Sequence, residues 1–213
     1  MYSQKIALFG NSGENSRLIA KEALRRGHYV TAIVLNERYF TLKHPNLKVI
    51  SGDVRKNYEV SKLSTDYDAV ICAHEPVEAK PREHVYVTRA VIEGVKDSGV
   101  RRLIFAVHRI GHPIERTEEA YDGFKPILKA QQEALKILKN ENLLQWGYVH
   151  SIVPEAVYQE GKYQNSNEIL FTTPEGENRL QEKEYSSVIL DEIEKYQIPY
   201  YNESLKGLME INI

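Results

Sequence analysis

Cysteine is almost absent from this chain. One residue, Cys72, stands among 213, so no disulfide can form within the chain. Every apolar run is far shorter than the roughly 18 residues that a membrane-spanning helix needs. The run that follows Met1 also lacks the core length and the cleavage site of a secretion signal. These absences predict a cytoplasmic protein with no membrane span.

Neither sign of charge is in large excess. Lys and Arg number 28 against 30 Asp and Glu, the net charge is −2, and no long stretch carries one sign. Nothing therefore favours nucleic acid or an anionic membrane as a partner. His108 and His112 have a helical metal spacing, but Gly111 and Pro113 oppose a helix there, so we expect no metal site.

The first 150 residues alternate short apolar runs with amphipathic stretches, and 42% of the chain is hydrophobic. Helical spacing predicts helices over 14–26, 82–98 and 126–140, with a short one over 58–63. The alternation predicts one α/β domain over residues 1–213, a Rossmann-type twisted parallel sheet with helices on both faces. The six predicted strands are Lys5–Phe9, Tyr29–Leu35, Leu47–Ile50, Asp68–Ala73, Arg102–Val107 and Leu144–His150.

The rhythm changes after residue 150. A short strand is predicted over 168–172, a helix over 182–196 and a last strand over 205–211. We expect residues 151–213 to form a small C-terminal part that covers the open, substrate-side edge of the sheet.

A glycine turn joins the first predicted strand to the first predicted helix, where residues 10–16 read G-N-S-G-E-N-S. Here a dinucleotide fold directs backbone N–H groups and a helix N-terminus at a pyrophosphate. Two positions depart from that pattern. Ser16 stands at the third small position, and Glu14 places a carboxylate that would repel a phosphate. The alternative is a purely structural turn in which Glu14 and Asn15 cap the helix.

Cofactor choice is read after the second strand, where residues 35–38 are L-N-E-R. Glu37 would suit the ribose hydroxyls of NAD, whereas Arg38 would suit the 2′-phosphate of NADP. The signal is split, with a slight preference for NADP, although Arg38 is also explained as a solvated loop cation. After the third strand, Asp53 can accept a hydrogen bond from an adenine amino group or serve as a turn aspartate.

The chain resembles the atypical short-chain dehydrogenase/reductases. The most similar branch contains NmrA-like proteins, proteins classed as NADH-flavin reductases, and biliverdin-reductase-B-like flavin reductases. The resemblance covers nearly the whole chain in order. It rests on K-I-A-L-F-G-N-S-G, E-A-L-R-R-G-H-Y-V-T-A-I-V, H-P-N-L-K-V-I-S-G-D-V, D-A-V-I-C-A, G-V-R-R-L-I-F, Q-Q-E-A-L-K-I-L and E-Y-S-S-V-I-L-D-E-I-E.

This resemblance implies NAD or NADP bound across the carboxyl edge of the sheet. Relatives often write the turn as G-A-T-G-x-x-G and carry arginine where this chain has Leu35. By position, the phosphates would lie at Gly10, Asn11, Ser12, Gly13, Asn15 and Ser16, the adenosine at Leu35, Arg38, Asp53 and Val54, and the nicotinamide-side ribose at Cys72, Ala73 and His74.

The Ser-Tyr-Lys triad of the wider superfamily is absent or displaced, since no serine directly follows the fifth strand. Tyr121 and Lys125 have the Tyr-x-x-x-Lys spacing, but Gly123 and Pro126 favour a helix that begins only afterwards. Counting back from the sixth strand instead aligns the helix lysine with Lys129. Among 14 tyrosines, a chance match is the better explanation.

Hydride transfer to a flavin-like ring depends on stacking and proximity more than on a protein acid. The sequence therefore favours an NAD(P)-dependent oxidoreductase acting on a small molecule such as a flavin or quinone, as a monomer or homodimer. Two alternatives stay open: a non-catalytic NmrA-like dinucleotide-binding regulator, and a Rossmann descendant that has lost its cofactor. Glu14 and Leu35 favour these two.

Overall fold

The computed structural model describes residues 3–10, 13–74, 79–107, 118–150, 168–170 and 182–195. These residues form one parallel sheet in the order β3-β2-β1-β4-β5-β6-β7, which confirms the predicted fold class. Its strands are β1 (Lys5–Gly10), β2 (Tyr29–Val34), β3 (Leu47–Ser51), β4 (Ala69–Ala73), β5 (Arg102–Val107), β6 (Gln145–His150) and β7 (Glu168–Leu170).

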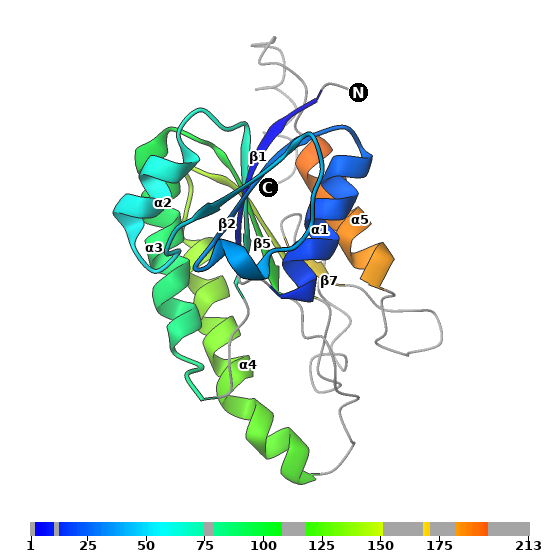
Figure 1. Ribbon diagram of the computed structural model, residues 1–213. Helices are drawn as coiled ribbons and strands as arrows, with labels where there is room; N and C mark the ends of the chain where they lie inside the picture. Colours follow the sequence, from blue (N-terminus) through cyan, green and yellow to red (C-terminus); the bar gives the residue numbers. More distant parts are fainter. Residues whose placement is uncertain are drawn as a thin grey trace.

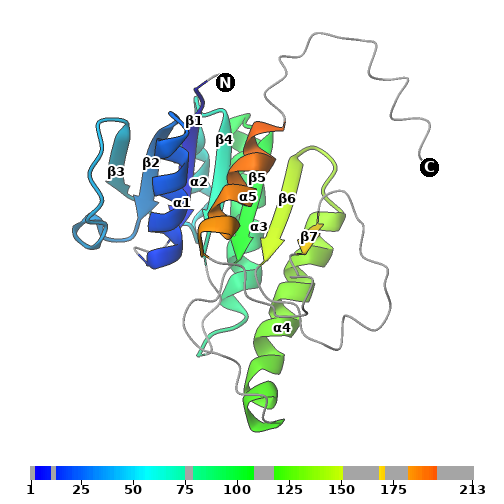
Figure 2. The same ribbon diagram turned by 90° about the vertical axis from the view of Figure 1, so that its right-hand side faces the viewer.

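Helices cover both faces of this sheet (Figures 1 and 2). Helices α1 (Glu14–Arg25) and α5 (Glu182–Glu194) pack on one face. Helices α2 (Asn57–Ser64), α3 (Glu83–Ser98) and α4 (Glu118–Lys139) pack on the other, and a 3₁₀ turn, η1 (Glu37–Tyr39), follows β2. Gly27 and Gly99, with φ of 86° and 81°, follow α1 and α3, as their sequence positions predict.

Two apolar clusters, one on each face, hold the layers together. Strand residues alternate between them: Ile6 and Leu8 of β1 face α1 and α5, whereas Ala7 and Phe9 face the opposite helices. Because the central strands are covered on both sides, they read in the sequence as unbroken apolar runs rather than as alternating ones. That property made the strands predictable.

Helix α4 departs from the prediction, because it begins at Glu118 and contains Pro126 instead of starting there. A proline removes one backbone hydrogen bond and crowds the preceding turn, which need not end a helix whose later turns are held by packing. Ile127, Ala130, Ala134 and Leu138 supply that packing. The N-terminal turns extend past the carboxyl edge of the sheet (Figure 1).

The described part of the C-terminal segment adds an edge strand and a covering helix. Strand β7 pairs with β6 in parallel, and α5 packs beside α1. Both lie where the sequence predicts them, each ending two residues earlier. The last strand, expected over 205–211, lies outside the described residues. That residues 151–213 cover the open edge of the sheet stays a prediction.

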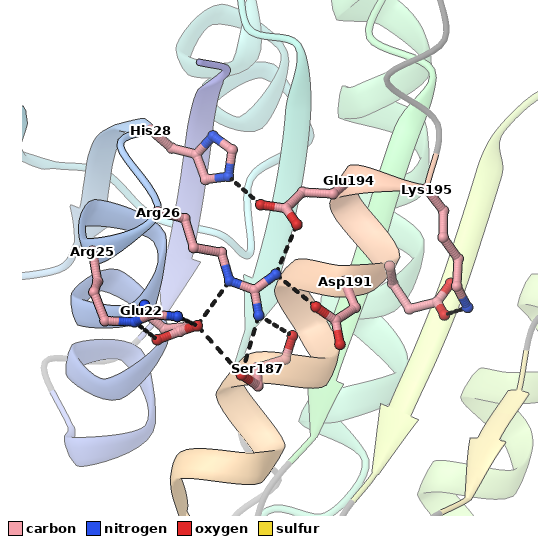
Figure 3. Close-up of polar contacts among 9 residues, drawn as sticks. Glu22, Arg25, Arg26, His28, Ser187, Asp191, Glu194 and Lys195 are labelled. Atoms are coloured by element: carbon pink, nitrogen blue, oxygen red, sulfur yellow. Dashed lines mark hydrogen bonds and ion pairs between the residues drawn. The ribbon is translucent and has the colours of Figure 1, made fainter. Parts of the chain in front are cut away.

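A cluster of charged groups fastens α5 to the end of α1 (Figure 3). The guanidinium of Arg26 donates to Glu22 Oε1 at 2.8 Å, to Asp191 Oδ1 at 2.6 Å and to Glu194 Oε2 at 2.8 Å. It also donates to the backbone oxygen of Ser187 at 3.0 Å. One nearly buried cation therefore links two helices that are far apart in the sequence.

Two neighbouring residues complete this cluster. The backbone N–H of Gln4 donates to Nδ1 of buried His28, so His28 Nε2 carries the proton and donates to Glu194 at 3.0 Å. Hydrogen bonds from Arg25, joined by those from Arg26, lower the pKa of the Glu22 carboxyl to about 2, against the opposing effect of burial. The Glu22 carboxylate is thus ionised at neutral pH.

We expect Arg26→Gln to lower the free energy of unfolding by about 3 kcal/mol, because it leaves partly buried carboxylates without their cation. The matched control is Arg25→Gln, since Arg25 pairs with the same Glu22 but its side chain is 67% exposed, against 10% for Arg26. That control is expected to lose much less, because solvent screens an exposed ion pair. Urea unfolding followed by circular dichroism measures both, and equal losses would contradict the interpretation.

Candidate functional site

The carboxyl ends of β1 and β4 meet at the centre of the sheet, where Gly10 pairs with Ala73. The chain leaves β1 toward β2 on one side, while β4 continues toward β5 on the other. Such a reversal of strand order opens a crevice at the carboxyl edge, which is where open α/β sheets bind ligands. The turn before α1 and the segment after β4 both border this position.

Gly10 is required here by close packing. A Cβ atom placed on it would overlap the hydroxyl of Ser16 and lie 3.5 Å from the Cβ of Ala73. Ser16 therefore occupies the space beside the first glycine, and its small side chain still lets α1 approach β1. This explains why a serine is tolerated at the third small position of the turn.

Asn15 and Ser16 are each only 1% exposed, yet their side chains find no hydrogen-bond partner among the described residues. Leaving an amide and a hydroxyl buried without partners costs about 1–3 kcal/mol each, so such groups indicate a missing ligand or water. Gly13, the N-cap residue, has no side chain to accept from the first N–H groups of α1. A phosphate oxygen fits these donors. Asn11 and Ser12 lie outside the described residues.

The alternative of a self-capped structural turn finds no support in these contacts. The Asn15 side chain has no partner among the described residues, α1 included, so it does not cap the helix. Glu14 is exposed at the first helical position. Its carboxylate suits the helix dipole and would weaken an anion bound beside it, as the sequence suggests.

The loop after β2 is organised by two side-chain contacts. Asn36 Oδ1 accepts from the backbone N–H of Arg38 at 3.1 Å and caps η1. Glu37 Oε1 accepts from the backbone N–H of Ser51 at 2.7 Å and from its hydroxyl at 3.0 Å. Leu35 and Arg38 are exposed. Among the charged groups of this loop, Glu37 is thus engaged with the protein, and Arg38 has no ion pair within the described part of the chain.

Asp53, after β3, is held by Arg55. The guanidinium donates to Oδ1 at 2.8 Å and to Oδ2 at 2.9 Å, and the backbone N–H of Arg55 also donates to Oδ1. These hydrogen bonds lower the pKa of Asp53 below its usual value. The same guanidinium reaches Glu83 Oε1 at 3.4 Å. Asp53 is therefore an ionised turn aspartate that keeps further acceptor capacity, beside the buried side chain of Val54.

Cys72 and Ala73 are fully packed in the sheet, so neither side chain is available to a ligand. Burial raises the pKa of the Cys72 thiol to about 12, which makes it an inert core residue, as the sequence predicts. Of the three residues expected at the nicotinamide-side ribose, His74 alone has a side chain that is not fully enclosed.

His74 belongs to a group of three polar rings that includes two residues the sequence did not single out. The rings of His74 and His84 stack with centroids 6.4 Å apart, and His84 Nε2 lies 3.2 Å from the hydroxyl of Tyr148. Burial lowers the pKa of both histidines, that of His84 to about 3. Both rings are therefore neutral at physiological pH.

The weak catalytic candidates all lie on α4. Tyr121 and Lys125 belong to the helix, so the argument that their segment precedes it was wrong; their side chains lie outside the described part. Lys129 is exposed on the same helix. The segment after β5, where the superfamily has its serine, is also outside the described residues.

No group of three or more His, Cys, Asp or Glu side chains placed to hold a metal ion occurs within the described ranges. No helix there combines the length and the apolar character needed to cross a bilayer.

Comparison with known proteins agrees with this geometry. A family described as NAD(P)H-binding matches residues 10–166. The Bacillus subtilis protein YwnB, whose name assigns no function, is 27% identical over 201 residues, which are 89% of this chain and 92% of that protein.

Solved structures extend the comparison. A Bacteroides thetaiotaomicron protein, provisionally described as an epimerase, is 25% identical with a TM-score of 0.70, over 92% of this chain and 93% of that one. A Streptococcus pneumoniae protein, provisionally described as an NADH-flavin reductase, is 24% identical with a TM-score of 0.65, over 91% and 94% of the two chains. The latter likeness is one of fold.

We expect acid to destabilise the protein through His84. Its pKa is lower in the folded state than the ordinary 6.5, so its contribution to stability is complete above pH 6.5 and is lost as pH falls toward 3. Between pH 7 and pH 5, wild type should lose about 2 kcal/mol more of its free energy of unfolding than His84→Phe. Urea unfolding at the two pH values measures this difference.

The control is His44→Phe, because His44 is exposed in a loop. It should follow the wild-type pH dependence. A wild-type protein and a His84→Phe variant with equal losses would show that His84 titrates normally in the fold.

Proposed function

Because this chain belongs to the NAD(P)H-binding family, we propose that it is an NAD(P)H-dependent oxidoreductase that passes hydride to a flavin or quinone without a Ser-Tyr-Lys triad. The observation that carries the proposal is the turn before α1, where Gly10 sits against Ser16 and the buried polar atoms of Asn15 and Ser16 have no partner in the described part of the chain. The fold shared with the Streptococcus pneumoniae NADH-flavin-reductase-like protein supports the choice of acceptor.

The residues present fit the cofactor along the edge of the sheet. Gly10, Asn15 and Ser16, with Asn11, Ser12 and Gly13, would hold the pyrophosphate at the N-terminus of α1. The adenosine would lie over Leu35, Arg38, Asp53 and Val54, with the ionised Asp53 accepting from the adenine amino group. Ala73 and the backbone of Cys72 would border the nicotinamide-side ribose, next to His74. The bound cofactor supplies a hydride, and the chain binds, orients and excludes water.

NADPH is the cofactor we propose, on the basis of the loop after β2. Glu37 already accepts two hydrogen bonds from Ser51, so its carboxylate is partly committed to holding β3. Arg38 is exposed on η1 without an ion pair to a described residue, and its guanidinium suits a 2′-phosphate. The unpaired thiol of Cys72 also suits the reducing cytoplasm, where we expect the protein to act as a monomer or homodimer.

A second candidate is a regulator that binds the dinucleotide without turnover. Glu14 favours it, because a carboxylate at the phosphate end lowers affinity, which suits a sensor of changing cofactor levels better than a saturated enzyme. Binding of NADPH without reduction of any flavin or quinone would identify this candidate. No binding at millimolar cofactor would leave a Rossmann descendant that has lost its ligand.

We expect Glu14→Gln to strengthen NADPH binding by about 2- to 5-fold, since it removes a negative charge beside the phosphates at the helix N-terminus. Titration calorimetry measures the dissociation constant. Glu133→Gln is the matched control, because Glu133 is an exposed residue of α4, away from a helix N-terminus. If both variants bind as wild type does, the phosphates do not lie at the start of α1.

Arg38→Ala is expected to weaken NADPH binding about 10-fold, as the loss of one charged hydrogen bond to the 2′-phosphate would, and to leave NADH binding within about 2-fold. Lys43→Ala, at an exposed position of the same connection, serves as the control and should bind both cofactors normally. Equal weakening of NADH and NADPH by Arg38→Ala would argue against recognition of the 2′-phosphate.

A further inference from the structure

Three polar rings run from the carboxyl edge of β4 into the core. His74 follows Ala73 directly, and Ala73 pairs with Gly10, the first residue of the turn before α1. Behind it, His84 of α3 is 1% exposed, and Tyr148 of β6 is equally enclosed, packed on Phe105 with ring centroids 6.2 Å apart. An apolar core does not need such groups, which suggests that they serve the edge at which the row ends.

The hydrogen bonds define which nitrogen of each ring carries the proton. In both histidines Nδ1 is buried and has no partner among the described residues. A neutral imidazole has one N–H, and a buried donor without an acceptor is rarer than a buried acceptor without a donor. Nε2–H is therefore the tautomer that we assign to both rings. In His84, Nε2 lies 3.2 Å from the Tyr148 hydroxyl, to which it would donate.

Contacts between successive rings fix the orientation of His84 and then of His74. The bond to Tyr148 fixes His84 in one tautomer and one ring direction, and the ring of His74 stacks on it with an interplanar angle of 18°. The charged groups around His74 balance one another: Glu83 and Asp53 are set against Arg55, which pairs with both. His74 is thus a neutral donor held in one plane.

We propose that His74 donates a hydrogen bond from Nε2–H to the carbonyl oxygen of the bound acceptor, a quinone or the flavin ring, and that His84 and Tyr148 position it for this task. The inference rests on the proposed function. It assigns to His74 the donor role that the Ser-Tyr-Lys triad fills elsewhere in the superfamily.

The chemistry balances without a protein acid. When bound, NAD(P)H would supply the acceptor with a hydride, which is one proton with two electrons, and would leave the site as NAD(P)⁺. The acceptor's carbonyl oxygen gains negative charge as the hydride arrives, and one proton from water then completes the dihydro product. A neutral imidazole stabilises this charge by hydrogen bonding without giving up its own N–H, as preorganised donors do for developing oxyanions. Planar conjugated carbonyl compounds are the substrate class that suits such a donor.

The experiment compares wild type with His74→Phe, which keeps an aromatic ring and removes the donor, and with His74→Gln, which keeps an N–H. Calorimetry measures NADPH affinity, and steady-state kinetics measure kcat with a soluble naphthoquinone and with FMN. We expect His74→Phe to lower kcat roughly 100-fold, far more than it changes NADPH affinity, and His74→Gln to retain much of the activity. Tyr148→Phe, which removes one hydroxyl, should give a smaller drop in kcat, again without loss of NADPH affinity.

Nitrogen-15 NMR of the imidazoles gives a readout that does not depend on turnover. At pH 7, wild type should show His74 and His84 as neutral Nε2–H tautomers, and the naphthoquinone added with NADP⁺ should shift His74 Nε2. A charged or Nδ1–H ring at position 74 would overturn the proposal, as would an unchanged kcat in His74→Phe. A wild type that binds NADPH and reduces neither acceptor would instead overturn the proposed function, and the inference with it.

Discussion

The pairing of β1 with β4 is the constraint on which the rest of the molecule depends. These strands are neighbours in the sheet although β2 and β3 separate them in the sequence, so the chain leaves their adjoining carboxyl ends toward opposite sides of the sheet. Gly10 also lies so close to Ser16 that a side chain on Gly10 would overlap the Ser16 hydroxyl. The turn before α1 and His74 are both placed by this one pair of strands.

Most of the fold could be predicted because a parallel sheet covered on both faces leaves a simple record in the sequence. Strands β1 to β6 are apolar runs that are separated by segments containing glycine, asparagine and charged residues. Their predicted bounds agree closely with the structure. Helix α4 was predicted poorly because local rules give Pro126 more weight than the distant packing of Ala134 and Leu138 that holds the helix. Local propensity and tertiary contact conflict there, and contact prevails.

The site could be predicted only where its residues are close in the sequence. The turn over residues 10–16 is such a case, since seven successive residues contain the glycine, the small residue and the helix start. The bond between His84 and Tyr148 joins residues 64 positions apart, and the link of Arg26 to Glu194 joins residues 168 apart. No pattern in the sequence predicts such pairs, because each partner has the surroundings of an ordinary helix or strand residue. Only the fold places the two partners side by side.

Binding of a dinucleotide at this turn, as we propose, depends on how the repulsion from Glu14 compares with the hydrogen bonds that Asn15 and Ser16 could donate. An exposed carboxylate at a helix N-terminus changes the free energy of a nearby anion by about 0.3–1 kcal/mol, and salt reduces this further. Each hydrogen bond from a buried group to a charged phosphate contributes about 1.5–3 kcal/mol, and Asn15 and Ser16 can each make one, in addition to the N–H groups of α1. Their sum exceeds the repulsion several-fold. Under the proposed function, Glu14 would therefore lower the affinity of the turn without abolishing it, which is compatible with an enzyme that must release its oxidised cofactor after each turnover.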